Sequence, residues 1–278
     1  MNQIVLGPSE KKSSGKTPVV LAIGGLDPSA GAGILADIKT ISAFGCYGVA
    51  AVTSITVQNT TGVSSIHNQP AELVYDQIKA LLDDFQIRAI KTGMLPNAGI
   101  IEAVASVLGG KSDRTLVVDP VLQSTSGFDL ASDIAALVER IFPMASLVTP
   151  NAKEAGRITG IDVVDEGSME EAGRVILKLG AGAVLVKGGD MNLAESIDIL
   201  IGPEGPTRFA APKIGSNNTH GTGCTLASAI AALLATGTPL SDAMRRAKAY
   251  VSKAIGTAPE IGNGFGPLNH FPKEDPED

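Results

Sequence analysis

Short runs of apolar, often β-branched residues alternate along the chain with longer segments in which apolar residues recur at helical spacing. The short runs predict strands at 19–23, 49–56, 88–91, 116–118, 146–148 and 183–186. The periodic segments predict helices at 33–44, 71–84, 98–108, 132–141, 169–179, 223–235 and 241–255. Strands that are apolar throughout, with helices between them, indicate an α/β fold with a mostly parallel central sheet and helices on both faces.

The alternation of strand and helix stops between about residues 196 and 214. Two strand patterns, 196–201 and 207–211, follow each other there without a helix, which predicts an antiparallel edge of the sheet. No linker or break in composition interrupts residues 18–271, so we expect one domain over this range. Residues 1–17 are expected to form a flexible tail, and residues 272–278 an acidic tail.

Charge and composition exclude several classes of protein. The 278 residues carry a net charge of −7, and only 4% of them are aromatic, which argues against a nucleic-acid-binding groove. No apolar run approaches the ~20 residues of a membrane span, and the first residues lack an apolar signal core, so we expect a cytoplasmic protein. The two cysteines, Cys46 and Cys224, are too few for a disulfide framework or a four-cysteine metal site.

Polar residues follow several of the predicted strands directly. Among them are Asp119, Asn151 with Glu154, and Lys187. The carboxyl ends of parallel strands meet at one edge of a sheet, where ligands bind in open α/β folds. Glycine, proline and asparagine at such places are also ordinary turn residues, whereas the charged side chains need another explanation. The sequence therefore predicts a ligand site at this edge.

Two glycine motifs resemble nucleotide-binding fingerprints but lack their context. Residues 31–36 match G-x-G-x-x-A, yet residues 26–30 separate them from the strand, and the second strand ends in Gln58 without an acid. The triplet Gly110-Lys111-Ser112 has Ala105 where a P-loop needs its first glycine, so it is expected to end a helix.

The run Thr219-His220-Gly221-Thr222-Gly223-Cys224 leads into the predicted helix 223–235. Two glycines at a helix start let backbone N–H groups converge on an anion, although a plain helix cap has the same pattern. The helix dipole is expected to lower the pKa of Cys224, with a small buried core residue as the alternative. His220 is expected to be a turn histidine that bonds the backbone, with an acid or base role left open.

A larger set of motifs occurs in order over residues 18–271. They are residues 25–33 with Asp37 and Lys39, Gln58-Asn59-Thr60, residues 91–95, Asp119-Pro120-Val121, Thr149-Pro150-Asn151 with Glu154, Lys187-Gly188-Gly189, and residues 219–225. Together they closely resemble the hydroxymethylpyrimidine/phosphomethylpyrimidine kinases of thiamine biosynthesis, which have a ribokinase-like fold. The resemblance implies a homodimer that uses ATP with Mg²⁺. It implies phosphorylation of 4-amino-5-hydroxymethyl-2-methylpyrimidine and then of its monophosphate.

The resemblance also implies a role for each matching residue. The substrate-binding residues would be Gln58, which reads the aminopyrimidine edge, and Gly25, Met94 and Val121, which line the pyrimidine pocket. ATP would contact Asn151, Lys187, Thr219 and Gly221, and Mg²⁺ would contact Glu154 and Asp119. The catalytic set would be Cys224, Gly221, Thr222, Gly223 and Lys187.

The chain departs from the family pattern at two positions. Ala30 stands where many relatives have glycine, and Thr125 stands where many have a lysine, which puts the second phosphorylation in question. Two alternatives remain: a pyridoxal kinase of the same superfamily, and a non-catalytic pyrimidine-binding protein. Consumption of ATP with each substrate would discriminate between them.

Overall fold

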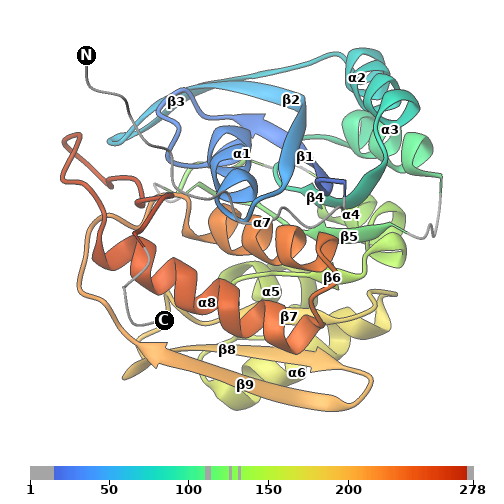
Figure 1. The fold of residues 1–278 in the computed structure, drawn as a ribbon. Helices are drawn as coiled ribbons and strands as arrows, with labels where there is room; N and C mark the ends of the chain where they lie inside the picture. The colour runs from blue at the N-terminus through green and yellow to red at the C-terminus, as the bar shows by residue number, and fades with distance from the viewer. Residues whose placement is uncertain (1–15, 110–113, 125–126, 131–132, 274–278) are drawn as a thin grey trace, which may run out of the picture.

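The computed structural model describes residues 16–109, 114–124, 127–130 and 133–273. Their strands form a nine-stranded sheet in the order β3-β2-β1-β4-β5-β6-β7-β8-β9 (Figure 1). The parallel strands are β1 (Val19–Leu26), β2 (Tyr47–Asn59), β4 (Ile87–Thr92), β5 (Thr115–Val118), β6 (Leu147–Val148) and β7 (Val184–Lys187). The antiparallel strands are β3 (Gly62–Asn68), β8 (Glu195–Gly202) and β9 (Gly205–Pro212). The predicted mostly parallel sheet with an antiparallel edge is confirmed.

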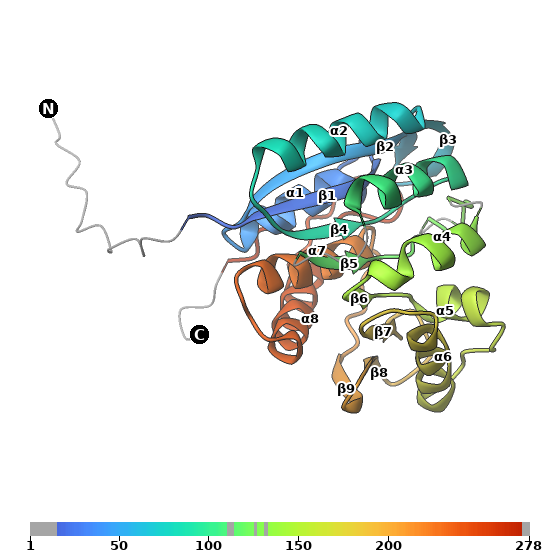
Figure 2. The same cartoon turned by 90° about the vertical axis from the view of Figure 1, so that its right-hand side faces the viewer.

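Helices cover both faces of this sheet (Figure 2). One face carries α1 (Gly33–Ala43), α7 (Thr222–Ala235) and α8 (Leu240–Gly256). The other carries α2 (Ala71–Asp84), α3 (Ala98–Leu108), α4 (Ile134–Arg140), the 3₁₀ turn η1 (Phe142–Met144), α5 (Ala152–Thr159) and α6 (Glu166–Lys178). Successive residues of β1 divide between two apolar cores, because Val20 faces α7 while Leu21 faces the opposite layer. Within the described ranges, no helix is both long and apolar enough to cross a membrane.

Two elements were not predicted by the apolar pattern. Helix α5 buries little apolar surface, but Asn151 and Glu154 form a capping box at its start and Gly160 ends it in the left-handed region. Strand β3 is only partly buried and pairs with β2 alone, so it lacks the apolar run that marks the central strands. The antiparallel arrangement is therefore present at both edges of the sheet.

The loop before α7 is held against the loop between β1 and α1. Gly221 has a φ of +83°, and a Cβ at this position would overlap the carbonyl oxygen of Gly31. A Cβ at Gly31 would in turn overlap the ring of His220. Glycine is required at both positions because the two loops approach so closely. This contact brings the start of α7 beside the carboxyl end of β1.

Candidate active site

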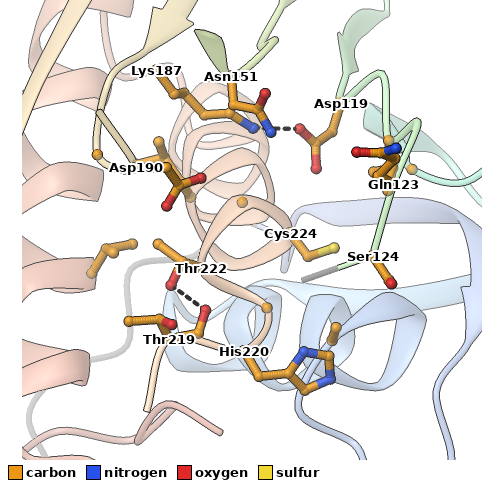
Figure 3. A pocket seen from close by; sticks show the side chains of 18 of the residues that line it. Asp119, Gln123, Ser124, Asn151, Lys187, Asp190, Thr219, His220, Thr222 and Cys224 are labelled. Carbon is orange, nitrogen blue, oxygen red and sulfur yellow. Dashed lines mark hydrogen bonds and ion pairs between the residues drawn. The ribbon is translucent and has the colours of Figure 1, made fainter. Parts of the chain in front are cut away.

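A cavity of about 620 Å³ lies at the carboxyl ends of the parallel strands (Figure 3). All the residues to which the sequence assigns a role line it: Gly25, Gln58, Met94, Asp119, Val121, Asn151, Glu154, Lys187, Thr219, Gly221, Thr222, Gly223 and Cys224. The expected pyrimidine-binding residues belong to β1, β2 and the segments after β4 and β5. Of the expected nucleotide-binding residues, Asn151 follows β6 and Lys187 ends β7, farther along the sheet, whereas Thr219 and Gly221 precede α7.

The start of α7 has the backbone geometry of an anion site. Gly221 is its N-cap, and no side chain of the described residues caps the helix. The hydroxyl of Thr222 instead donates to the carbonyl oxygen of Thr219 at 2.7 Å, which ties the loop to the first turn (Figure 3). First-turn N–H groups without a side-chain acceptor, at the positive end of the helix dipole, favour a phosphate.

Cys224 lies in this first turn and is partly exposed to the cavity. The expectation that the helix dipole lowers the pKa of its thiol is wrong. Burial raises the pKa to about 11, since the nearby Asp37 and Asp119 carboxylates offset the opposing effect of Lys91 and of the Gly33 N–H. The thiol is therefore protonated at neutral pH.

Lys187 and Asp119 form an ion pair across the cavity, with 2.7 Å between Nζ and Oδ1 (Figure 3). The hydroxyl of Thr149 donates to the same oxygen at 3.1 Å. Burial pushes the pKa of Asp119 upward, but the charges of Lys187 and Lys91 outweigh it and lower the pKa. Burial pushes the pKa of Lys187 downward, and the carboxylates of Asp119 and Glu154 raise it overall. Both groups are thus charged, and each stabilises the other.

The carboxylate of Glu154 both fixes the start of α5 and faces the cavity as an ionisable group. Its Oε2 accepts from the N–H of Asn151 at 2.8 Å and its Oε1 from the N–H of Leu122 at 3.4 Å, which fixes the start of α5. Burial is the largest cause that raises its pKa to about 7, and the negative charge of Asp119 raises it further against the opposing charge of Lys187.

Two carboxylates that face one cavity and repel each other are suited to an oxygen-binding divalent cation. Mg²⁺ is usually held by one or two carboxylates together with phosphate oxygens of the substrate. Asp119 and Glu154 meet this requirement, while no group of three or more ligand-type side chains occurs in the part of the chain that the structure describes. The residues fit a Mg²⁺ ion that is completed by nucleotide phosphates.

The structure adds a pair that the sequence did not predict. Nε2 of His220 lies 2.7 Å from Oδ2 of Asp27, and both side chains are buried. The backbone N–H of His220 bonds the carbonyl oxygen of Gly266, as expected for a turn histidine, and its ring in addition contacts a carboxylate. The signal available in the sequence was Asp27 itself, an acid placed directly after the buried strand β1.

Two further ion pairs lie at the edge of the cavity. Lys91 contacts Asp37 at 2.9 Å, and the hydroxyl of Ser228, one turn after Cys224 in α7, donates to the same carboxylate at 2.8 Å. At the other end of the sheet Lys248 contacts Asp198 at 2.6 Å. The only sequence signal for this second pair was a single acid inside the apolar strand β8. Thr125, where the chain departs from the family pattern, lies outside the described residues.

Comparison with known proteins gives consistent matches over nearly the whole chain. A family model described as phosphomethylpyrimidine kinase matches residues 27–269. The thiamine biosynthesis bifunctional protein ThiED of Geobacter sulfurreducens is 48% identical over 254 residues, which cover 91% of this chain and 52% of that protein. This chain thus spans about half the length of that relative. The hydroxymethylpyrimidine/phosphomethylpyrimidine kinase of Rhizobium meliloti is 44% identical over 260 residues, which cover 92% of this chain and 97% of the relative.

Solved structures share the same fold. The pyridoxal kinase of Staphylococcus aureus in complex with AMP-PCP and pyridoxal has a TM-score of 0.84 at 31% identity, with 92% of this chain and 95% of that chain covered. The phosphomethylpyrimidine kinase of Clostridium difficile 630 has a TM-score of 0.76 at 38% identity, with 86% and 100% covered. Both are ribokinase-like α/β kinases. With a family model over most of its length and relatives above 40% identity, the chain belongs to the phosphomethylpyrimidine kinase family.

Proposed function

We propose that the chain transfers the γ-phosphoryl group of ATP to the hydroxymethyl group of 4-amino-5-hydroxymethyl-2-methylpyrimidine, and then a second phosphoryl group to the monophosphate. The observation that carries this proposal is a single cavity whose wall holds both a hydrogen-bonding group suited to a pyrimidine and backbone donors suited to a phosphate. Gln58 offers an amide to an aminopyrimidine edge beside Gly25 and Met94, and the uncapped start of α7 offers N–H groups to a phosphate.

Phosphoryl transfer depends on positioning and on neutralisation of charge rather than on covalent chemistry by the protein. Lys187 supplies a fixed positive charge beside Asp119, and the first turn of α7 supplies backbone donors. A thiol whose pKa is about 11 keeps its proton at neutral pH, which supports a role for Cys224 in positioning the substrate hydroxyl rather than in removing its proton.

We propose that Glu154 and Asp119 hold Mg²⁺ with the nucleotide. When bound, the ion neutralises charge on the phosphate oxygens. Glu154 also fixes the start of α5 through the N–H groups of Asn151 and Leu122, so its carboxylate is already oriented before the ion binds. From the family resemblance we further propose a cytoplasmic location and a homodimer. Light scattering of the purified chain would test the dimer, and cell fractionation would test the location.

The test is the product mixture after incubation of the pyrimidine alcohol with MgATP, with pyridoxal in a parallel reaction. We expect pyrimidine monophosphate and then diphosphate. Pyridoxal is the second substrate to test because the Staphylococcus aureus pyridoxal kinase shares the fold closely. Faster turnover of pyridoxal than of the pyrimidine would overturn the assignment, and tight pyrimidine binding without ATP consumption would indicate a binding protein.

The second phosphorylation is tested at Thr125. The family resemblance implies that a lysine at this position binds the monophosphate through a charge-assisted bond, which is roughly twice as strong as a neutral one. We therefore expect Thr125→Lys to raise kcat/KM for the monophosphate more than for the free alcohol. An equal gain for both substrates would show that Thr125 does not approach the substrate phosphate.

A further inference from the structure

Lys91 and Asp37 form a fully buried ion pair beside α7. Nζ of Lys91, on β4, lies 2.9 Å from both carboxylate oxygens of Asp37, on α1. Their side chains are 1% and 0% exposed. The hydroxyl of Ser228 on α7 donates to Oδ1 of Asp37 at 2.8 Å, so the pair is bonded to the helix that carries the anion site. Stability alone does not explain the pair, because well-packed apolar residues often replace a buried ion pair without loss.

The ammonium of Lys91 lies at the wall of the cavity. Lys91 and Asp37 both line it, together with Gly93 and Cys224. Gly93 leaves room for the ammonium, since a Cβ at this position would lie 2.9 Å from Nζ of Lys91. Asp37 engages at most two of the three hydrogens of the ammonium. A fixed positive charge is thus placed directly beside the space that would receive phosphate.

The positive charge of this pair outweighs the negative one at Cys224. The charge of Lys91 lowers the pKa of the Cys224 thiol, and Asp37 raises that pKa by a smaller amount. Two opposite charges act on a third point mainly through the nearer one. At the first turn of α7 the pair therefore acts as a partial positive charge, although its net charge is zero.

Lys91 and Lys187 approach this turn from two separate strands. Lys91 belongs to β4 and Lys187 ends β7, and β5 and β6 lie between these strands in the sheet. Lys187 lies on the side of Gly223, where a Cβ would be 3.2 Å from its Nζ. A phosphate at the first turn of α7 would therefore have a second ammonium near it, in addition to Lys187.

We propose that Lys91 gives the anion site at the start of α7 a second fixed positive charge, and that this charge serves chiefly the second transfer, in which the acceptor is the pyrimidine monophosphate. Because its side chain is buried, Lys91 acts through the electrostatic potential at this turn and is a positioning residue. The proposal rests on the pyrimidine kinase activity proposed above.

The second transfer brings two anions together. A deprotonated oxygen of the monophosphate bonds to the γ-phosphorus of ATP, and the bond from this phosphorus to ADP breaks, with its electron pair going to ADP. The neutral alcohol of the first transfer brings no such charge to the site. Neutralisation of charge is the main contribution of the protein to phosphoryl transfer, so the monophosphate depends more on an added positive charge.

The test compares two variants that share the substitution Asp37→Asn. Asp37→Asn alone keeps the ammonium of Lys91 and an oxygen that can accept from Ser228. The double variant Asp37→Asn/Lys91→Met replaces the pair by neutral side chains of similar size. It leaves no buried charge unpaired, so we expect it to fold even if the single variant is too unstable, and it is then compared with wild type directly.

The first readout is kcat/KM for the monophosphate divided by kcat/KM for the alcohol, because this ratio does not depend on the fraction of folded enzyme. We expect it to fall by about tenfold or more in the double variant and not to fall in Asp37→Asn. Lys79→Met/Asp83→Asn, in the exposed pair on α2, is the matched control and should leave the ratio unchanged. An equal loss for both substrates in the double variant would overturn the proposal, since Lys91 would then only support the fold.

The second readout needs no substrate. Alkylation of Cys224 by the anion iodoacetate is compared with alkylation by neutral iodoacetamide, and peptide mass spectrometry assigns the product to Cys224. The thiolate fraction cancels in the ratio of the two rates, which reports the potential at the sulfur. We expect the ratio to be about threefold or more higher in wild type and in Asp37→Asn than in the double variant.

The two readouts separate failure of this proposal from failure of the proposed function. An equal alkylation ratio in all three proteins would overturn the role of Lys91, whatever the enzyme phosphorylates. If the wild type phosphorylates neither the alcohol nor the monophosphate, the proposed function fails, and with it the use of this charge in the second transfer.

Discussion

The ammonium of Lys187 lies 2.7 Å from the carboxylate of Asp119, at the ends of two strands that β6 separates in the sheet. Their side chains are only 12% and 2% exposed, so the pair carries two charges into the wall of the cavity. A buried charge that loses its partner is strongly destabilised. The Lys187–Asp119 pair therefore links the charge balance of the site to its ability to receive phosphate.

Loss of the Lys187 charge and loss of the Glu154 charge should respond differently to Mg²⁺. Lys187→Ala and Glu154→Gln should each lower kcat, by about 10² to 10³ for the lysine by analogy with lost anion-hole donors. Raising Mg²⁺ should partly restore Glu154→Gln, because that variant still offers an oxygen ligand. It should not restore Lys187→Ala, since the lysine acts as a fixed charge.

The measurement is kcat against Mg²⁺ concentration for both variants at saturating ATP. Lys79→Ala, in the exposed pair with Asp83 on α2, is the matched control and should leave kcat unchanged. Equal recovery of both active-site variants with Mg²⁺ would show that the two roles are wrongly assigned.

Gln58→Leu should impair use of the pyrimidine and spare the nucleotide. Leucine has a similar size but leaves the polar edge of the substrate without an amide partner, and it removes the contact of Gln58 with Nε2 of His220. An unmade hydrogen bond of this kind costs about 1–3 kcal/mol, so KM for the pyrimidine should rise by about 5- to 150-fold. Steady-state kinetics with each substrate varied in turn would check it, and an unchanged pyrimidine KM would remove Gln58 from the site.

The sequence predicted the central sheet because buried parallel strands leave an unambiguous apolar run. The apolar pattern did not predict helix α5, because the polar residue Glu154 occupies one of its few buried positions. Asn151 and Glu154 were instead identified because they directly follow a predicted strand, and the resemblance to a kinase family then implied their roles. The capping hydrogen bonds and the proposed nucleotide and Mg²⁺ contacts therefore involve the same two side chains, and apolar periodicity detects neither.

The site was predictable where one segment carries the signal, as in the loop 219–224 or the residues that directly follow a strand. The site was not predictable where an ion pair or hydrogen bond joins two side chains that are distant in the sequence. Asp27 and His220 are 193 positions apart, and Lys248 and Asp198 are 50 apart, so no local pattern joins them. The pKa of Cys224 was mistaken for the same reason, because its burial depends on elements far from α7 in sequence.

His270 should make the protein less stable as the pH falls. Burial, aided by the charge of Lys39, lowers its pKa to about 4, against about 6.5 in the unfolded chain. Between these values the unfolded state binds more protons, so the stabilising contribution is complete above pH 6.5 and is lost as pH falls through 4. The shift corresponds to about 3 kcal/mol.

The check is urea unfolding of wild type and His270→Gln at pH 7 and pH 4. The free energy of unfolding of the wild type should fall relative to that of the variant by about 3 kcal/mol over this interval. His67→Gln on β3 is the matched control for the substitution. A constant difference between wild type and His270→Gln would mean that His270 takes up its proton without cost in the folded state.

Cys224 should behave as a neutral thiol of the pocket wall. With its pKa raised to about 11, its thiolate fraction at pH 7.5 is about two orders of magnitude below that of an ordinary cysteine, so alkylation by iodoacetamide should be slower to a similar degree. Cys224→Ser keeps a hydroxyl that can accept from the Gly33 N–H and contact the substrate. We therefore expect kcat to stay within about tenfold of wild type, with the same pH profile between 7 and 9. A general base contributes about 10² to 10⁴ to rate, so a loss of that size in Cys224→Ser would instead identify the thiol as the base.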